Sequence, residues 1–269
     1  MRLRPSLLIP LVAFALAACS GAAASPRAEP GAAAGEIQVY AAASLRAVLA
    51  KARAAYEAAN PGTVVTVSTD SSAALETRIE QGAPADVFLS ADMESPRKLV
   101  DGGFASGDVT AFTGNLLTVI VPTSNPARIT TPADLASDGV RIIAAADGVP
   151  IQAYTATLLG NLARVPGYPA DMVEKVAANV VSREDNAGAV VTKVALGEGD
   201  AGVVYMTDAT TSEAVTTVEI PADANVPATY GGVVVKASKS PGAAAAFLAW
   251  LAGPDGQAIL ASFGFQPVS

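Results

Sequence analysis

The chain has 269 residues, a formal net charge of −8 at pH 7, one cysteine and no histidine. This acidic balance argues against nucleic acid as a partner, because binding to the phosphate backbone depends on clustered lysine and arginine. Without histidine the usual general base and the commonest metal ligand are missing. Ser-His and Cys-His catalytic pairs, Cys/His metal centres and an intrachain disulfide are therefore excluded.

The first residues have the pattern of an export signal. Two arginines precede an apolar run at residues 7–18, which is too short to span a bilayer and ends in small residues before Cys19. We expect residues 1–18 to be a signal peptide. The sequence Leu-Ala-Ala-Cys also resembles the bacterial lipoprotein box, in which the cysteine is lipidated. The alternative is a free thiol that follows a signal peptide by chance.

After the cysteine, the chain is rich in Ala, Gly, Pro and Ser as far as residue 35. We interpret residues 19–35 as the lipidated cysteine and a flexible tether, which would hold the protein on the outer face of the cytoplasmic membrane. The roughly 230 residues that follow are enough for one large or two modest α/β domains.

Strand and helix patterns alternate along these remaining residues, which predicts α/β layers with largely parallel sheets. The first alternation runs from a β-branched and aromatic strand at residues 37–40 to Ser44, where a helical pattern starts. A helix start presents free N–H groups and partial positive charge, so an oxyanion bound there could also accept the Ser44 hydroxyl proton. The alternative is that Ser44 only caps its own helix.

A second junction has the same form. The strand predicted at residues 64–68 leads to Ser71 and Ser72, after which the composition is helical. A third buried strand, predicted at residues 87–90, precedes a helix that Asp92 is expected to cap. Hydroxyl groups therefore stand at two of the first three strand-to-helix junctions.

Two apolar runs, at residues 116–122 and 229–235, are expected to cross into a second lobe and to return from it. Between them, a buried strand at residues 140–145 leads to Val149 and Pro150. Proline in the first helical turn removes one N–H and leaves the next amides facing outward.

Two further strands complete the second lobe. The strand predicted at residues 177–181 is followed by a polar loop that ends at Asn186, and the strand at residues 201–205 delivers Tyr205 to its carboxyl end. Open α/β sheets bind ligands at the carboxyl ends of their strands. These segments should therefore converge if the two lobes face each other.

Taken in order, these motifs resemble the substrate-binding proteins of molybdate ABC transporters. The resemblance covers most of residues 37–265. Its specific parts are Ala41-Ala42-Ala43-Ser44-Leu45, Ser71-Ser72, residues 82–92, Gly114-Asn115-Leu116, Val149-Pro150, residues 196–205 and Gly264-Phe265.

The resemblance implies a two-lobed periplasmic-binding-protein fold of type II. Each lobe would be a mainly parallel sheet flanked by helices, with the ligand cleft between the lobes. We expect one lobe to contain residues 36–113 and 229–269, and the other to contain residues 114–228.

The resemblance also implies a function. A monomer would capture molybdate, and tungstate as well, outside the cell and deliver it to an ABC permease, without a cofactor and without catalysing a reaction. The expected anion ligands are the side chains and amides of Ser44 and Ser72, the Ile151 amide, Asn186 and the Tyr205 hydroxyl. Ser71 and Tyr154 are additional candidates, although a solvated cap and a ring at the edge of the core explain them equally well.

Three alternatives remain open. The same fold could bind another tetrahedral oxyanion, such as sulfate, thiosulfate or phosphate. A secreted serine hydrolase could use Ser44 or Ser72, but it would lack a histidine base and a Gly-x-Ser-x-Gly elbow. A structural surface lipoprotein would bind nothing.

Relatives often have an apolar residue where Asn186 stands, so either its backbone N–H or its side-chain amide could be the donor.

Overall fold

A computed structural model describes residues 35–268 of the chain. The predicted signal peptide, Cys19 and most of the predicted tether lie outside these residues. Among residues 35–268, none of the helices combines the length and the apolar composition that a membrane span requires.

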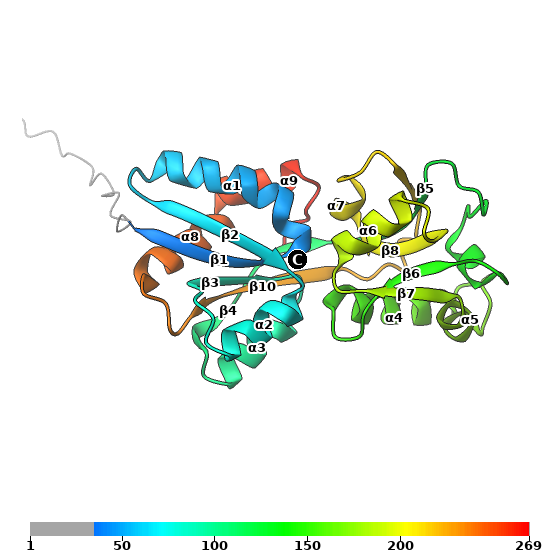
Figure 1. The fold of residues 1–269 in the computed structure, drawn as a ribbon, viewed down its shortest axis with the longest axis horizontal. Coiled ribbons are helices and arrows are strands. Elements are labelled where there is room, and N and C mark those ends of the chain that lie inside the picture. The colour runs from blue at the N-terminus through cyan, green and yellow to red at the C-terminus, as the bar shows by residue number, and fades with distance from the viewer. Residues whose placement is uncertain (1–34, 269) are drawn as a thin grey trace, which may run out of the picture. The chain divides into compact units, whose positions relative to one another are not determined.

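The first of two five-stranded sheets combines four strands from the first part of the described chain with one strand, β10, from its last part. Its strands are β1 (Glu36–Ala42), β2 (Val64–Asp70), β3 (Val87–Ser90), β4 (Ala105–Asn115) and β10 (Ala228–Val235), in the order β2-β1-β3-β10-β4. Its helices are η1 (Ala43–Leu45), α1 (Arg46–Ala59), α2 (Ser72–Glu80), α3 (Glu94–Asp101), α8 (Pro241–Ala252) and α9 (Pro254–Ser262). In Figure 1, α1, α8 and α9 cover one face of this sheet, and α2 and α3 cover the other.

The second sheet is formed by the middle of the chain. Its strands are β5 (Leu117–Pro122), β6 (Ile142–Ala145), β7 (Val180–Glu184), β8 (Ala201–Tyr205) and β9 (Val215–Val218), in the order β7-β6-β8-β5-β9. Its helices are η2 (Pro132–Ala136), α4 (Pro150–Leu162), α5 (Met172–Ala178), α6 (Ala187–Ala195) and α7 (Met206–Ala209). Figure 1 shows α6 and α7 on one side of this sheet and α4 and α5 on the other.

The central strands are buried because helices cover both faces of each sheet. Every residue of β3, β5 and β8 is buried. Such strands have continuous apolar sequences instead of alternating ones. The short apolar runs of the sequence therefore identify the strands that form the middle of each sheet.

Each sheet mixes parallel and antiparallel pairs, whereas the sequence suggested mainly parallel sheets. Strand β1 is parallel to β2 and β3, but β10 is antiparallel to β3 and β4. In the second sheet β6 is parallel to β7 and β8, but β5 is antiparallel to β8 and β9. Strands β5 and β10 enter their sheets at the edge where β8 and β3 end, so they must run against those neighbours.

The segment before Asn186 also differs from the prediction. A strand was expected at residues 177–181, but the chain is helical in α5 and becomes a strand only in β7. Met172 and Val176 are both buried, one helical turn apart. The chain therefore continues as a short helix that buries these two residues, and the strand starts three residues later than predicted, at Val180.

Candidate functional site

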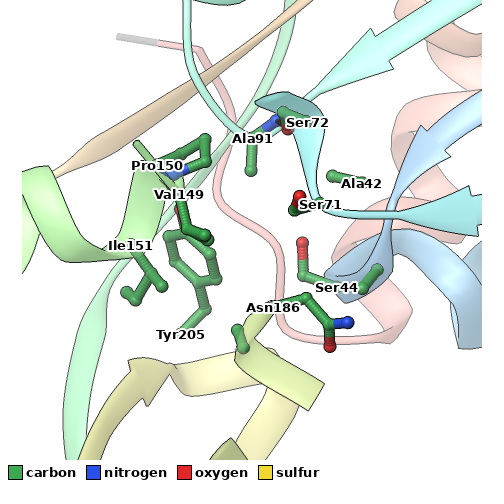
Figure 2. Close-up of a pocket in the computed structure, with 12 residues that line it drawn as sticks. Ala42, Ser44, Ser71, Ser72, Ala91, Val149, Pro150, Ile151, Asn186 and Tyr205 are labelled. Atoms are coloured by element: carbon green, nitrogen blue, oxygen red, sulfur yellow. Dashed lines mark hydrogen bonds between the residues drawn. The ribbon is translucent and has the colours of Figure 1, made fainter. Parts of the chain in front are cut away.

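A pocket lies where helices of both halves of the fold begin (Figure 2). It contains about 240 Å³ of space, part of which is open to solvent. It is lined by Ala42, Ala43, Ser44, Ser71, Ser72, Ala91, Val149, Pro150, Ile151, Asn186, Ala187 and Tyr205. None of these residues carries a formal charge, so any ion bound here depends on dipoles and neutral hydrogen-bond donors.

Two adjacent serines contribute hydroxyl groups at the start of α2. Ser71 is the N-cap, and its Oγ accepts the Ala74 N–H at 3.3 Å. Ser72 is buried, and its Oγ accepts the Ala91 N–H at 3.0 Å. Because both hydroxyl oxygens act as acceptors towards the protein, both hydroxyl protons are available for donation to a ligand.

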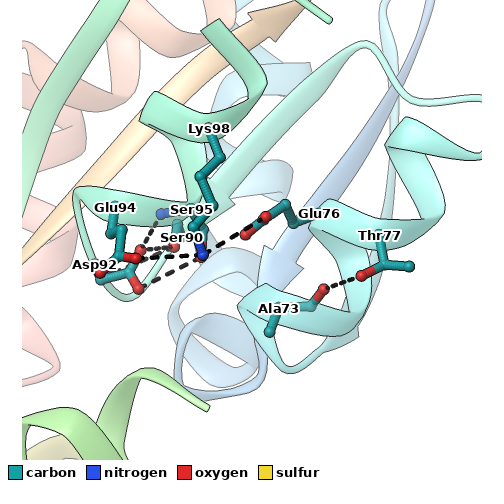
Figure 3. A network of polar contacts seen from close by, with 8 residues as sticks. All are labelled: Ala73, Glu76, Thr77, Ser90, Asp92, Glu94, Ser95 and Lys98. Atoms are coloured by element: carbon teal, nitrogen blue, oxygen red, sulfur yellow. Dashed lines mark hydrogen bonds and ion pairs between the residues drawn. The ribbon is translucent and has the colours of Figure 1, made fainter. Parts of the chain in front are cut away.

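Ala91, the donor to Ser72, stands between Ser90 and Asp92, which are joined by hydrogen bonds. Asp92 Oδ1 accepts the Ser90 hydroxyl proton at 2.8 Å and the Ser95 N–H at 2.9 Å (Figure 3). The second bond satisfies a free N–H in the first turn of α3, as the sequence predicts for a capping residue. These hydrogen bonds therefore fix the position of the Ala91 N–H, which orients the Ser72 hydroxyl.

Ser44 lies in η1, directly after β1. Its Oγ is 2.9 Å from the hydroxyl of Tyr230. Figure 2 shows the Ser44 hydroxyl directed towards the space that the lining residues surround. Its side chain does not cap a helix through any hydrogen bond within residues 35–268, so the alternative that Ser44 serves only as an N-cap is not supported.

Helix α4 begins at the pocket with Pro150, which has no N–H. Within residues 35–268, no acceptor pairs with the N–H of the next residue, Ile151. The start of a helix carries partial positive charge. The Ile151 amide is thus a free donor in a favourable electrostatic environment, whatever its side chain.

Asn186 is the N-cap of α6, and its Oδ1 accepts the Ala189 N–H at 3.0 Å. Its side-chain amide points away from the pocket in Figure 2. The sequence left open whether the backbone N–H or the side-chain amide of Asn186 is the donor, and this arrangement favours the backbone N–H.

Ala187, the first residue of α6, also lines the pocket. The sequence interpretation missed it because alanine carries no chemical signal.

Tyr205 ends β8 and is 2% exposed. Its hydroxyl is buried and has no hydrogen-bond partner among residues 35–268. Burial, followed by the neighbouring Tyr230, raises the pKa of Tyr205 well above its ordinary value, so the hydroxyl keeps its proton. A buried hydroxyl without a partner is destabilising by about 1–3 kcal/mol, and an acceptor in the pocket would remove that penalty.

Six of the predicted residues therefore meet in this pocket, from five separate segments of the chain. They are Ser44, Ser71, Ser72, Ile151, Asn186 and Tyr205. Tyr154 lies outside the lining, and its ring packs edge-on against Tyr205 with the centroids 6.3 Å apart. Burial raises the pKa of Tyr154 to about 12. Its position is that of a support for the Tyr205 ring.

Asp208 is a buried carboxyl group close to this pocket that the sequence interpretation did not identify. It is 3% exposed, and its Oδ2 has no hydrogen-bond partner among residues 35–268. Burial raises the pKa of Asp208 to about 7. It lines a second hollow, which shares Ala43, Ser44 and Asn186 with the pocket. No signal in the sequence distinguishes it from an exposed aspartate after a strand.

The geometry of the pocket suits a fully ionised oxyanion. Such an ion needs donors from several directions, and the pocket has hydroxyl groups and helix starts from both halves of the fold. These groups belong to helix and strand ends, so they are already oriented and lose little on binding. None of the residues that line the pocket is a histidine, a carboxylate or a lysine, so the lining gives the serine hydroxyls no general base of these kinds.

Known proteins share this sequence and this fold. The bacterial extracellular solute-binding protein family matches residues 37–266. The molybdate-binding protein ModA of Mycobacterium tuberculosis (strain H37Rv) is 32% identical over 256 residues, which cover 95% of this chain and 94% of that protein. YvgL of Bacillus subtilis (strain 168), whose name describes an ABC transporter substrate-binding lipoprotein, is 32% identical over 85% of each chain.

Among solved structures, the periplasmic molybdate-binding protein of Azotobacter vinelandii has a TM-score of 0.73 at 24% identity. The match covers 87% of this chain and 100% of that chain, and it confirms the predicted periplasmic-binding-protein fold. The relatives are named as binding proteins, which shows a solute-binding role at the level of the family. The chain belongs to the bacterial extracellular solute-binding proteins and, among them, to the family of the molybdate-binding protein ModA.

Proposed function

We propose that this chain binds molybdate in the pocket between the two halves of the fold. The donors would be the side chains and amides of Ser44 and Ser72, the Ile151 amide, the backbone at Asn186 and the Tyr205 hydroxyl, with Ser71 as an additional donor. One observation carries the proposal: the buried Tyr205 hydroxyl lines a donor-rich pocket and has no partner among residues 35–268. A metal-oxo dianion provides the missing acceptor.

Molybdate is the cargo of this protein and not a cofactor. Two of the relatives are named as molybdate-binding proteins, and the site contains the neutral donors that an acidic protein needs to hold a dianion. Tungstate has the same charge and the same tetrahedral shape, so the same donors would bind it.

The two lobes would be residues 36–113 with 229–269, and residues 114–228. The strands of the two sheets support this division, because the chain changes sheet between β4 and β5 and again between β9 and β10. Only a closed arrangement joins the donors of both lobes around one ion, so closure would mark the loaded protein for an ABC permease. The protein would act as a monomer, and lipid attached to Cys19 would keep it near that permease.

Calorimetric titration of the mature protein tests this function. We expect molybdate and tungstate to bind at one site, with sulfate and phosphate at least 100-fold weaker, because donors spaced for the larger ions leave over-long contacts to sulfate. A preference for sulfate or phosphate would replace molybdate with the first alternative ligand. Ester hydrolysis that is lost in Ser44→Ala would revive the hydrolase. If no oxyanion binds, the remaining interpretation is the third alternative, a structural surface lipoprotein.

A further inference from the structure

A series of buried hydrogen bonds lies behind Ser44. Asn115 ends β4, Tyr230 lies in β10 and Thr207 lies in α7. Asn115 Nδ2 donates to Thr207 Oγ1 at 2.8 Å and to Tyr230 Oη at 3.2 Å, and Tyr230 Oη is 2.9 Å from Ser44 Oγ. All four side chains are buried, and only Ser44 lines the anion pocket.

The orientation of the Asn115 side chain is determined by its other end. Asn115 Oδ1 accepts the backbone N–H of Leu116 at 3.0 Å. A backbone N–H can only donate, so the oxygen of the amide must be on that side and the NH₂ group on the other. The two protons of Nδ2 then serve two acceptors, Thr207 Oγ1 and Tyr230 Oη.

This orientation also determines where the proton of Tyr230 goes. Its oxygen already accepts from Asn115, and Ser44 Oγ is the remaining hydrogen-bond partner among residues 35–268. If Ser44 donated instead, the buried Tyr230 proton would have no acceptor, which is an unfavourable arrangement. Burial keeps the pKa of Tyr230 well above its ordinary value, so this proton is retained. Tyr230 therefore donates to Ser44, and the Ser44 proton is left for the pocket.

We propose that Tyr230 and Asn115 are positioning residues that fix the direction of the Ser44 hydroxyl, so that the Ser44 proton is directed to the bound anion. The proposal rests on the proposed function, since it assigns Ser44 to that anion site. Ser71 and Ser72 also accept a protein N–H, at 3.3 and 3.0 Å. With the direction of Ser44 fixed, each of the three serine oxygens accepts a protein proton and has its own proton left for the ion, which favours an oxyanion that has lost all its protons.

A double-mutant cycle separates this role from a general effect on packing. We expect Tyr230→Phe to weaken molybdate binding about tenfold, which is the upper end of the range for a hydrogen bond between two neutral groups. In a Ser44→Ala background, the same substitution should have almost no further effect, because Tyr230 acts through the hydroxyl that is already removed. Equal losses in both backgrounds would overturn the proposal. Tyr56→Phe, another buried tyrosine, is the matched control and should leave the affinity unchanged.

A second variant reverses the direction of the series. In Asn115→Asp the carboxylate accepts from Tyr230, so Tyr230 accepts from Ser44 and a lone pair of Ser44 faces the pocket. We expect the ratio of the dissociation constants of hydrogen phosphate and molybdate to fall at least 30-fold at pH 7.5, where phosphate is largely monoprotonated. An unchanged ratio in folded protein would contradict the proposal. If this variant does not fold, the double-mutant cycle of Tyr230→Phe and Ser44→Ala still tests the proposal.

A measurement without ligand distinguishes failure of this inference from failure of the proposed function. In the NMR spectrum of the ligand-free protein, the slowly exchanging Tyr230 hydroxyl proton should show cross-relaxation to the Ser44 β protons. A proton directed away from Ser44 would overturn the inference even if molybdate binds tightly. If molybdate does not bind but this proton points to Ser44, the series of hydrogen bonds stands and the proposed cargo is wrong.

Discussion

Replacing Asn186 with aspartate is expected to weaken molybdate binding more than 100-fold without lowering the stability of the ligand-free protein. Asn186 caps α6 through its Oδ1, and an aspartate oxygen can accept the same Ala189 N–H. Asp is as good a cap as Asn, and its charge interacts favourably with the helix dipole. The fold should therefore tolerate the substitution.

The loss of affinity comes from the new charge beside the ion. A unit charge about 8 Å from a dianion is repelled by about 4 kcal/mol at an effective dielectric constant near 20, so the new carboxylate acts on molybdate even though the side chain points away from the pocket. Even with screening by solvent, this repulsion exceeds the roughly 2.7 kcal/mol that corresponds to 100-fold. Calorimetry at low and high salt should show a loss that salt partly reverses.

Asn186→Ser provides the matched control for this charge. Serine retains the cap without charge, so we expect binding within a few-fold of the wild type and no salt dependence beyond that of the wild type. Wild-type affinity in Asn186→Asp would mean that the ion does not lie next to the start of α6. A large loss in both variants would instead assign the side-chain amide to the ligand.

Replacing Asp208 with asparagine is expected to stabilise the protein above pH 7 by up to about 4 kcal/mol. Burial raises the pKa of Asp208 from 3.8 to about 7 in the folded protein. A difference of about three pKa units corresponds to about 4 kcal/mol. Because the folded protein holds this proton more tightly than the unfolded chain does, this contribution to stability is present at low pH and is lost as the pH rises from about 4 to about 7.

Urea unfolding of the wild type and of Asp208→Asn between pH 4 and pH 8 measures this effect as the difference between their free energies of unfolding. The two proteins should have similar free energies of unfolding near pH 4, and the variant should become progressively more stable up to about pH 7. Asp171→Asn is a suitable control, because Asp171 is exposed and pairs only with Lys175 among the described residues. A difference between Asp208→Asn and the wild type that does not change with pH would show that Asp208 ionises normally in the folded protein.

Much of the fold follows from local sequence patterns. Short apolar runs identify the buried strands, and the polar residues after them identify the helix starts that form the pocket. Strand β4 was not predicted, because it begins with exposed residues and contains two glycines. Its pairing with β10, from the far end of the chain, explains why it is extended.

The pocket residues could be predicted because each stands at a strand-to-helix junction or at a strand end. The buried residues that surround the pocket without lining it could not be predicted. Tyr230 is 186 positions from Ser44 and 115 positions from Asn115, and they meet because β10 pairs with β4 on one side and with β3, the neighbour of β1, on the other. The same limitation applies to Asp208, whose burial depends on how α7 packs against β5, β8 and β9.

A crystal structure of the protein with molybdate tests the central claim most directly. Neutral donors from both halves of the fold should surround the ion, with Ser44 Oγ, Ser72 Oγ and Tyr205 Oη each at about 2.7–3.0 Å from an oxygen of the ion. An ion bound at another place, or a Tyr205 hydroxyl that still has no partner in the complex, would contradict this account.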